Sequence, residues 1–439
     1  MKILLDDMVA NGDMTVKQRN ETLEKYTEDV SALVLNNNYR QTQALGVAVT
    51  ESSKRIEEYR RLINAMESDG KLNRELELLP SDDVILDRKA NDQALTRPEL
   101  SVLISYVKGD LKSLLAVDDL VNDPFVKQIV ETEFPADMLK KFKQPIHAHR
   151  LRKEIIATQV ANDLVNYLGI TSFNRLHEST GATAVETAKA FVASREIFGL
   201  HALWSSIESL DYKITPELQS KMMLRTQRMA RRGTRWLIKN YRTGIDIESV
   251  IALYREATQT LMAQLSDILP GQAKEIWEKD IASMVEGGVP EELARAVAST
   301  DMAYISLGIV AVAQNMNQKP IDVAMGYFAV GEALGLEAFA RLVNALNVNT
   351  HWQAMARESY RDDLEWQQRR ITQGLFVNIK KSDSLPKVIE SWLDENHILV
   401  DRWLKMLNEI RGVNEPELSM YSVAIRELLD LSQATMPEF

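Results

Sequence analysis

The sequence predicts an all-α protein, a multi-helix array or bundle, and three observations lead to this prediction. Apolar residues recur at spacings of three and four, as Leu23, Tyr26, Val30 and Leu33 do, which is the period of a helix with one buried side. Residue types that begin helices precede many such stretches. Sustained alternation of apolar and polar residues, which a half-buried sheet requires, does not occur.

Helix starts are encoded at four places. Residues 96–99 (TRPE) and 414–417 (NEPE) each offer a capping side chain followed by a glutamate at the third helical position, so two orphan N–H groups gain acceptors. Thr215-Pro216 and Asp123-Pro124 place a proline at the first helical position, where its missing donor is harmless. We therefore expect helices to begin at all four.

Length and composition indicate a globular protein of two or three units. Of 439 residues, 45% are hydrophobic and 26% charged, which provides ample material for a core. There is no cysteine, so a reducing cytoplasm is expected and a thiol nucleophile is excluded. The acidic start, MKILLDDMVANGD, lacks an export signal, and no apolar run is long enough to cross a membrane. A net charge of −11 argues against general nucleic-acid binding.

Two regions and an internal repeat are expected within the helical pattern. Residues 1–75 are predicted to form one helical segment and 80–439 an all-helical domain, connected by 75–80 (ELELLP). Residues 184–203 align without a gap on 320–339, and Gly199 and Gly335 match as left-handed residues that end a helix. Chance similarity of alanine-rich helices remains an alternative to duplication. The repeat-like segments are 160–203 and 299–339.

A histidine-rich stretch, HAHRLRKEIIATQVANDLVNYLG at 147–169, resembles a ligand site but does not have metal-site spacing. His147 and His149 are two residues apart, whereas two ligands on one helix face are four apart, and no third ligand is near. We expect no metal there. Three amides further along lie beside an apolar row of the same helix, and we interpret them as a polar contact cluster or, alternatively, an effector site. They are Gln159, Asn162 and Asn166.

A basic stripe is the strongest charge anomaly. Six basic side chains step by three or four residues along one helix face about 25 Å long, and no acid occurs between Glu217 and Asp246. Pairing with acidic helices or a neighbouring domain is the expected role, and binding of a nucleic acid or another polyanion is the alternative. The stripe consists of Arg225, Arg228, Arg232, Arg235, Lys239 and Arg242.

Motifs of common active sites are missing. The sequence contains no dinucleotide glycine loop after a strand, no phosphate-binding loop, no HExxH zinc motif and no GxSxG nucleophile elbow. From the residues alone, no catalytic, cofactor-binding or metal-ligating residue is predicted in this chain.

Four segments resemble the C-terminal region of the large bacterial NAD-specific glutamate dehydrogenases. These are 13–45 (DMTVKQRNETLEKYTEDVSALVLNNNYRQTQAL), 95–108 (LTRPELSVLISYVK), 149–176 (HRLRKEIIATQVANDLVNYLGITSFNRL) and 233–240 (GTRWLIKN). The resemblance covers essentially the whole chain. It implies an oxidoreductase that converts L-glutamate, NAD and water to 2-oxoglutarate, ammonia and NADH.

The same resemblance implies that the chemistry lies outside this chain. The family's glycine-rich NAD loop and its catalytic lysines and aspartate have no counterpart here, so the resemblance implies a chain that begins just past the catalytic core. NAD is then a cofactor of the parent enzyme and not of this part. The expected partners are the chain's own catalytic domain and further copies of itself. Because helices within 2–50 would lose their covering core, we expect the isolated chain to self-associate or to have mobile ends, which light scattering and proteolysis would test.

Overall fold

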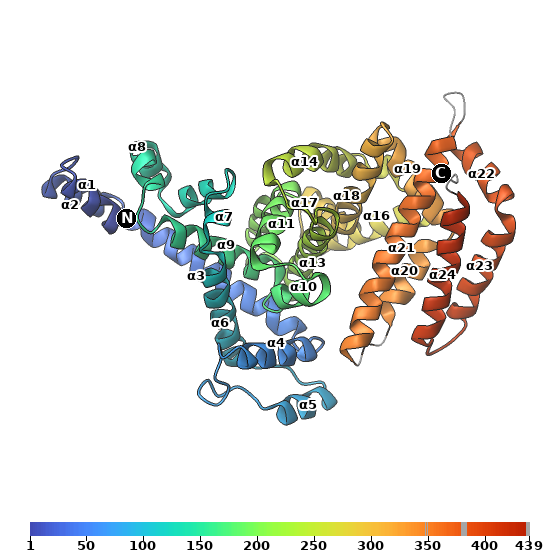
Figure 1. Ribbon diagram of the computed structural model, residues 1–439, viewed down its shortest axis with the longest axis horizontal. Coiled ribbons are helices and arrows are strands. Elements are labelled where there is room, and N and C mark those ends of the chain that lie inside the picture. Colours follow the sequence, from blue (N-terminus) through green and yellow to red (C-terminus); the bar gives the residue numbers. More distant parts are fainter. Residues whose placement is uncertain (347, 349, 379–383, 436–439) are drawn as a thin grey trace. The chain divides into compact units, whose positions relative to one another are not determined.

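The computed structural model describes residues 1–346, 348, 350–378 and 384–435, and it divides into two compact units, Met1–Ala252 and Leu253–Phe439. The described residues contain helices, turns and bends but no strand, which confirms the predicted all-α class (Figure 1). The region boundary predicted at 75–80 lies inside the first unit, where these residues form a turn and not a strand, and it stays a prediction.

The first unit begins with α1 and extends to the first turns of α14 (Figure 1). Its elements are α1 (Lys2–Ala10), α2 (Val16–Lys25), α3 (Thr27–Glu51), α4 (Ile56–Ser68), α5 (Asp82–Ala90), α6 (Arg97–Leu115), α7 (Asp118–Val121), the 3-10 helix η1 (Val126–Glu133), α8 (Ala136–His147), α9 (Arg152–Leu168), α10 (Ser172–Thr180), α11 (Ala184–Ile197), α12 (Leu200–Glu208), α13 (Pro216–Asn240) and α14 (Ile247–Ala263).

The second unit continues from α14 to the C-terminal helices. Its elements are α15 (Leu265–Ile268), α16 (Gly271–Glu286), α17 (Glu291–Ala298), α18 (Thr300–Asn315), α19 (Pro320–Ala333), α20 (Leu336–Ala345), α21 (His351–Asn378), α22 (Leu385–Glu395), α23 (His397–Arg411) and α24 (Leu418–Thr435). No single helix of the described residues is long and apolar enough to cross a membrane; only two bent helix pairs reach that length and hydropathy, each pair taken together.

The predicted helix starts are largely confirmed. Thr96 caps α6 with a complete capping box, and Thr215 caps α13 ahead of Pro216. Asp123 accepts hydrogen bonds from the next two available N–H groups and leads into η1. The start expected at 414 is wrong, because α24 begins at Leu418. The α6 start has a support that local sequence does not show, since Arg88 binds both carboxylate oxygens of Glu99 at 2.7 and 3.0 Å.

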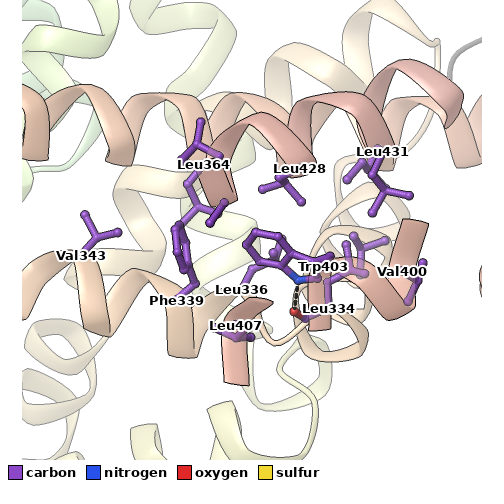
Figure 2. Packing of buried hydrophobic residues seen from close by; sticks show 14 of the residues in the cluster. Leu334, Leu336, Phe339, Val343, Leu364, Val400, Trp403, Leu407, Leu428 and Leu431 are labelled. Carbon is purple, nitrogen blue, oxygen red and sulfur yellow. Dashed lines mark hydrogen bonds between the residues drawn. The ribbon is translucent and has the colours of Figure 1, made fainter. Parts of the chain in front are cut away.

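The core of the second unit is built around an aromatic cluster on α20, α23 and α24. Trp403 is fully buried, and its ring lies edge-on to Phe339 at a centroid distance of 5.2 Å (Figure 2). The indole N–H donates a 2.7 Å hydrogen bond to the carbonyl of Leu334, so the one polar group of the ring is satisfied (Figure 2). The ring of Tyr421 also packs on Phe339, at a centroid distance of 5.7 Å. Leucines and valines of the same helices complete the cluster.

Two glycines predicted to be left-handed are confirmed. Gly199 has φ +60° between α11 and α12, and Gly335 has φ +63° between α19 and α20. A side chain at either position would strain the backbone in this region. The two helix pairs thus share a turn as well as a sequence pattern, and duplication of the helix pair stays a prediction.

Two helical glycines differ in what surrounds them, which gives a paired prediction. A Cβ at Gly233 of α13 would lie 2.4 Å from the ring of Phe198 and 2.8 Å from the hydroxyl of Ser194, whereas none of the described atoms lies within 4 Å of a Cβ at Gly109 of α6. Gly233→Ala should lower the free energy of unfolding by about 1–3 kcal/mol through overpacking. Gly109→Ala should raise it by about 0.5–1 kcal/mol. Denaturant titrations that shift both variants in the same direction would refute this.

Candidate functional site

The amides predicted as a polar cluster on α9 are not gathered into one site. Gln159 is buried and donates a 3.0 Å hydrogen bond to Asp163 one turn on. Asn162 is half-buried, and the side-chain oxygen of Asn166 is buried without a hydrogen bond from the described residues. Gln159 is therefore a structural contact, while an effector role for the three amides stays a prediction.

The centre of the α9 network is an ion pair that the sequence reasoning missed. Arg195 of α11 donates a 2.8 Å hydrogen bond to Asp163, and their side chains are only 7% and 4% exposed. Arg195 also binds Glu196, at 3.0 Å. Buried charges need partners of this kind, because the low dielectric leaves them otherwise unstabilised. A carboxylate between Val160 and Leu164, on the apolar side of α9, was the signal available in the sequence.

A histidine and a tyrosine border this ion pair but do not form an acid–base pair with it. The ring of His201 lies 3.7 Å from Asp163 and shares a 2.7 Å hydrogen bond with the hydroxyl of Tyr167. Burial lowers the pKa of His201, so the ring is neutral at pH 7. Burial, reinforced by Asp163, raises the pKa of Tyr167, so the hydroxyl remains a donor. The hydrogen bond between Tyr167 and His201 holds α9 against α12.

A polar seam joins the middle of α3 to the following helices. Five consecutive residues, 39–43 (YRQTQ), each contact a residue between 97 and 211; we call this set the α3 seam. The contacts are Tyr39 to Asp211 at 2.6 Å, Arg40 to Glu208 at 4.0 Å, Gln41 to Lys108 at 3.2 Å, the Thr42 carbonyl to Arg97 at 3.3 Å and Gln43 to Trp204 at 2.7 Å.

The α3 seam is partly buried, unlike an ordinary set of polar contacts on a protein surface. Trp204 is 3% exposed, and its indole N–H donates to the side-chain oxygen of Gln43. Burial and the hydrogen bond to Asp211 raise the pKa of Tyr39, which keeps its hydroxyl protonated as a donor. The four hydrogen bonds of the seam contribute about 1 kcal/mol net each, so together they hold α3 with a few kcal/mol.

The beginning of α3 is held at Tyr26, which immediately precedes the helix. The Tyr26 ring is 2% exposed, and its hydroxyl donates a 2.8 Å hydrogen bond to Asp137 of α8. Lys25 binds the same carboxylate oxygen at 2.8 Å. The predicted inward stripe is confirmed here, since Leu23, Val30 and Leu33 are half-buried on the Tyr26 side. Two attachments thus position α3 within the first unit.

Lys108 gives a prediction with a pH dependence. The amine is half-buried, donates to the neutral amide of Gln41 and has no carboxylate within 4 Å among the described residues, and burial lowers its pKa from 10.5 to about 8. At pH 7 it is charged in both the folded and the unfolded chain, so folding carries a desolvation cost of up to about 3 kcal/mol. Lys108→Met should therefore raise the free energy of unfolding by about 1–2 kcal/mol at pH 7, after loss of the bond to Gln41.

This gain should disappear as pH rises from 8 through 10.5, because the native lysine loses its proton first and the cost vanishes. Urea titrations of wild type and Lys108→Met at pH 7 and pH 10 measure the difference. Lys112→Met, on the exposed side of the same helix, is the control and should show no such pH dependence. A gain that is equal at both pH values would show that the charge of Lys108 is not its cause.

The predicted basic stripe lies on α13 and the residues after it. Arg228 and Arg242 are exposed, and the other four side chains are half-buried. Arg231, one position off the stripe, faces the buried carboxylate of Glu58. Burial alone would raise the pKa of Glu58, but Arg175, Arg55 and Arg231 hold it below its usual value. One arginine of α13 therefore helps to keep an acid of α4 ionised, while the roles predicted for the stripe stay predictions.

The two histidines of the opening stretch have separate structural partners. His147 contacts Glu131 at 2.6 Å, and the ring of His149 is buried and accepts a hydrogen bond from the N–H of Leu151 at 3.0 Å. No cluster of three or more metal-ligating side chains occurs among the described residues. The two imidazoles thus bind different elements.

Fold and site together define an all-helical module whose best-developed polar site secures one helix, α3, at its beginning and along its middle. The family described as glutamate dehydrogenase, C-terminal, matches residues 92–430, and the chain belongs to this family. Residues 1–48, predicted only to adjoin a catalytic core, match the family of the catalytic domain of bacterial NAD-glutamate dehydrogenase.

Curated relatives agree with the family. The chain is 44% identical to the NAD-specific glutamate dehydrogenase of Pseudomonas aeruginosa, 40% to that of Halomonas elongata and 30% to that of Mycobacterium tuberculosis, in each case over 99% of this chain. It spans only 27% of the length of each of these proteins. The α3 seam connects the two matched regions, because residues 39–43 lie in the match to the catalytic domain and all their partners lie in the match to the C-terminal family.

Proposed function

We propose that this chain is the C-terminal helical part of an NAD-specific glutamate dehydrogenase and that it braces the catalytic domain of that enzyme. The parent enzyme oxidises L-glutamate to 2-oxoglutarate and ammonia and passes the hydride to NAD. The observation that carries the proposal is the α3 seam, which joins residues of the catalytic-domain match to residues of the C-terminal match.

We propose that NAD binds to the part of the enzyme outside this chain. A dinucleotide site of the common type is formed where a strand runs through a glycine-rich turn into a helix, so that backbone N–H groups meet the pyrophosphate. The described residues form no strand, and the turns at Gly199 and Gly335 each join two helices. We therefore assign hydride transfer and cofactor binding to the part of the enzyme outside this chain.

Bracing follows from the physics of the two attachments. A helix that carries part of one domain and is hydrogen-bonded to another through four of five consecutive residues cannot rotate or slide without breaking several hydrogen bonds at once. Enzymes that transfer a hydride depend on ångström-scale positioning, since a displacement of about 1 Å can cost about a hundredfold in rate. A firm α3 would thus help to fix the geometry of the catalytic domain.

The test is glutamate-dependent formation of NADH, followed at 340 nm with two proteins. The 439-residue chain alone should produce none, and the full-length protein should produce NADH from L-glutamate and NAD. Turnover by the chain alone would contradict the assignment of the chemistry to the outside part. A folded full-length protein that fails to oxidise glutamate would contradict the proposed function itself.

A further inference from the structure

The first half of α3 is largely exposed, although it lies between two attachments. Tyr26 fixes the beginning of the helix on Asp137, and the α3 seam fixes residues 39–43. Between them, every side chain from Thr27 to Asn38 is exposed except Val30 and Leu33, which are half-buried. Three turns of a firmly attached helix thus face solvent within this unit.

The exposed side of this segment carries apolar residues of its own. Leu35 is 67% exposed, Val34 is 52% exposed, and Ala32 is exposed beside them. Because each helical residue turns by about 100°, Leu35 lies about 180° around the axis from Tyr26, opposite the buried side. Glu28 and Asn38 flank Leu35 on the same side, at i−7 and i+3. We call Ala32, Val34 and Leu35 the α3 outer face.

A single exposed leucine is common on protein surfaces, so a role for the α3 outer face has to be argued from its surroundings. Its residues belong to the segment that matches the catalytic-domain family, and the chain spans 27% of the length of its relatives. A helix that carries apolar residues on two opposite sides is typical of an element packed between two domains. One of those domains, the helices between 97 and 211, is present here.

We propose that the α3 outer face is the docking surface for the rest of the catalytic domain, which packs an apolar patch on Leu35 and donates hydrogen bonds toward Glu28 and Asn38. This inference rests on the proposed function and adds the surface through which it operates. α3 is then a shared helix, with its seam on the C-terminal part and its outer face on the catalytic domain.

Cysteine labelling tests the inference because the chain contains no cysteine of its own. Leu35→Cys is introduced into the 439-residue chain and into the full-length protein, and the rate of maleimide addition is measured by peptide mass spectrometry. Ile398→Cys is the matched control, since Ile398 is 70% exposed near the start of another helix. Relative to the control, Leu35→Cys should react about tenfold or more slowly in the full-length protein than in the chain alone, because a packed contact excludes water and reagent.

Two results would overturn the inference. Equal relative rates in both proteins would show that the α3 outer face stays uncovered. Protection in the chain alone that increases with protein concentration would show that a second copy covers it. Glutamate oxidation is assayed in the same full-length samples, so an active but unprotected enzyme refutes the docking surface and leaves the proposed function standing. An inactive wild-type enzyme refutes the proposed function instead.

Discussion

Replacing Asp163 with alanine is expected to lower the free energy of unfolding of the first unit by about 3–5 kcal/mol, because the buried guanidinium of Arg195 loses its partner. The two side chains are 4% and 7% exposed and only 2.8 Å apart, so water cannot replace the carboxylate. Gln159 also loses its acceptor in this variant. Urea denaturation followed by circular dichroism measures the change, with peptide-level hydrogen exchange locating it on α9, α11 and α12.

Asp119→Ala is the control for this prediction. Asp119 also pairs with a basic side chain, Lys189 at 3.2 Å, but it is 73% exposed, and such pairs contribute at most about 1 kcal/mol. A double replacement, Asp163→Leu with Arg195→Met, should recover much of the loss because it removes both buried charges. A loss in Asp163→Ala no larger than in Asp119→Ala would show that the buried pair does not hold this unit together.

Trp403→Ala is expected to have a comparable effect on the second unit, about 3–5 kcal/mol, because it removes the largest fully buried side chain of that core and leaves a cavity. The ring packs on Phe339 and donates to the carbonyl of Leu334, so the variant loses packing and a buried hydrogen bond together. Hydrogen exchange should accelerate in α20, α23 and α24 and remain unchanged in the first unit.

Two further variants separate the causes of the Trp403 effect. Trp403→Phe keeps an aromatic ring and loses the donor, so it should cost less than the alanine variant. Trp352→Ala removes a tryptophan that is 79% exposed at the start of α21, and it should change stability by less than about 0.5 kcal/mol. If the Trp352 and Trp403 variants were equally destabilised, the described core would not be the centre of this unit.

The helices were predictable because their signals are local. The capping box at Thr96 and the proline after Thr215 act within one turn, and both are confirmed. The start at 414 was wrong although its residues read almost the same as those at 96. Arg88 lies eight residues before Thr96 and reaches Glu99 only after the chain folds back. The contact that supports the start of α6 therefore lies outside the four residues from which that start was predicted.

The site was less predictable because its partners come from distant elements. The row of amides on α9 predicted a polar contact cluster, and Gln159 does make a buried hydrogen bond to Asp163. The partner that completes this contact, Arg195, comes from another helix. The α3 seam lies inside a segment that the family resemblance used, yet residues 39–43 contact positions up to 172 residues away. No periodicity within α3 specifies those contacts, which depend on tertiary packing.

The central claim is that the α3 seam couples the C-terminal part to the catalytic domain of a glutamate dehydrogenase. The most direct measurement is the initial rate of glutamate-dependent NADH formation by full-length protein carrying both Tyr39→Phe and Gln43→Leu. Tyr106→Phe, which removes a hydrogen bond to Glu77 outside the seam, is the control. We predict a rate about tenfold or more below wild type for the seam variant and an unchanged rate for the control. A correctly folded seam variant with the wild-type rate would contradict the claim.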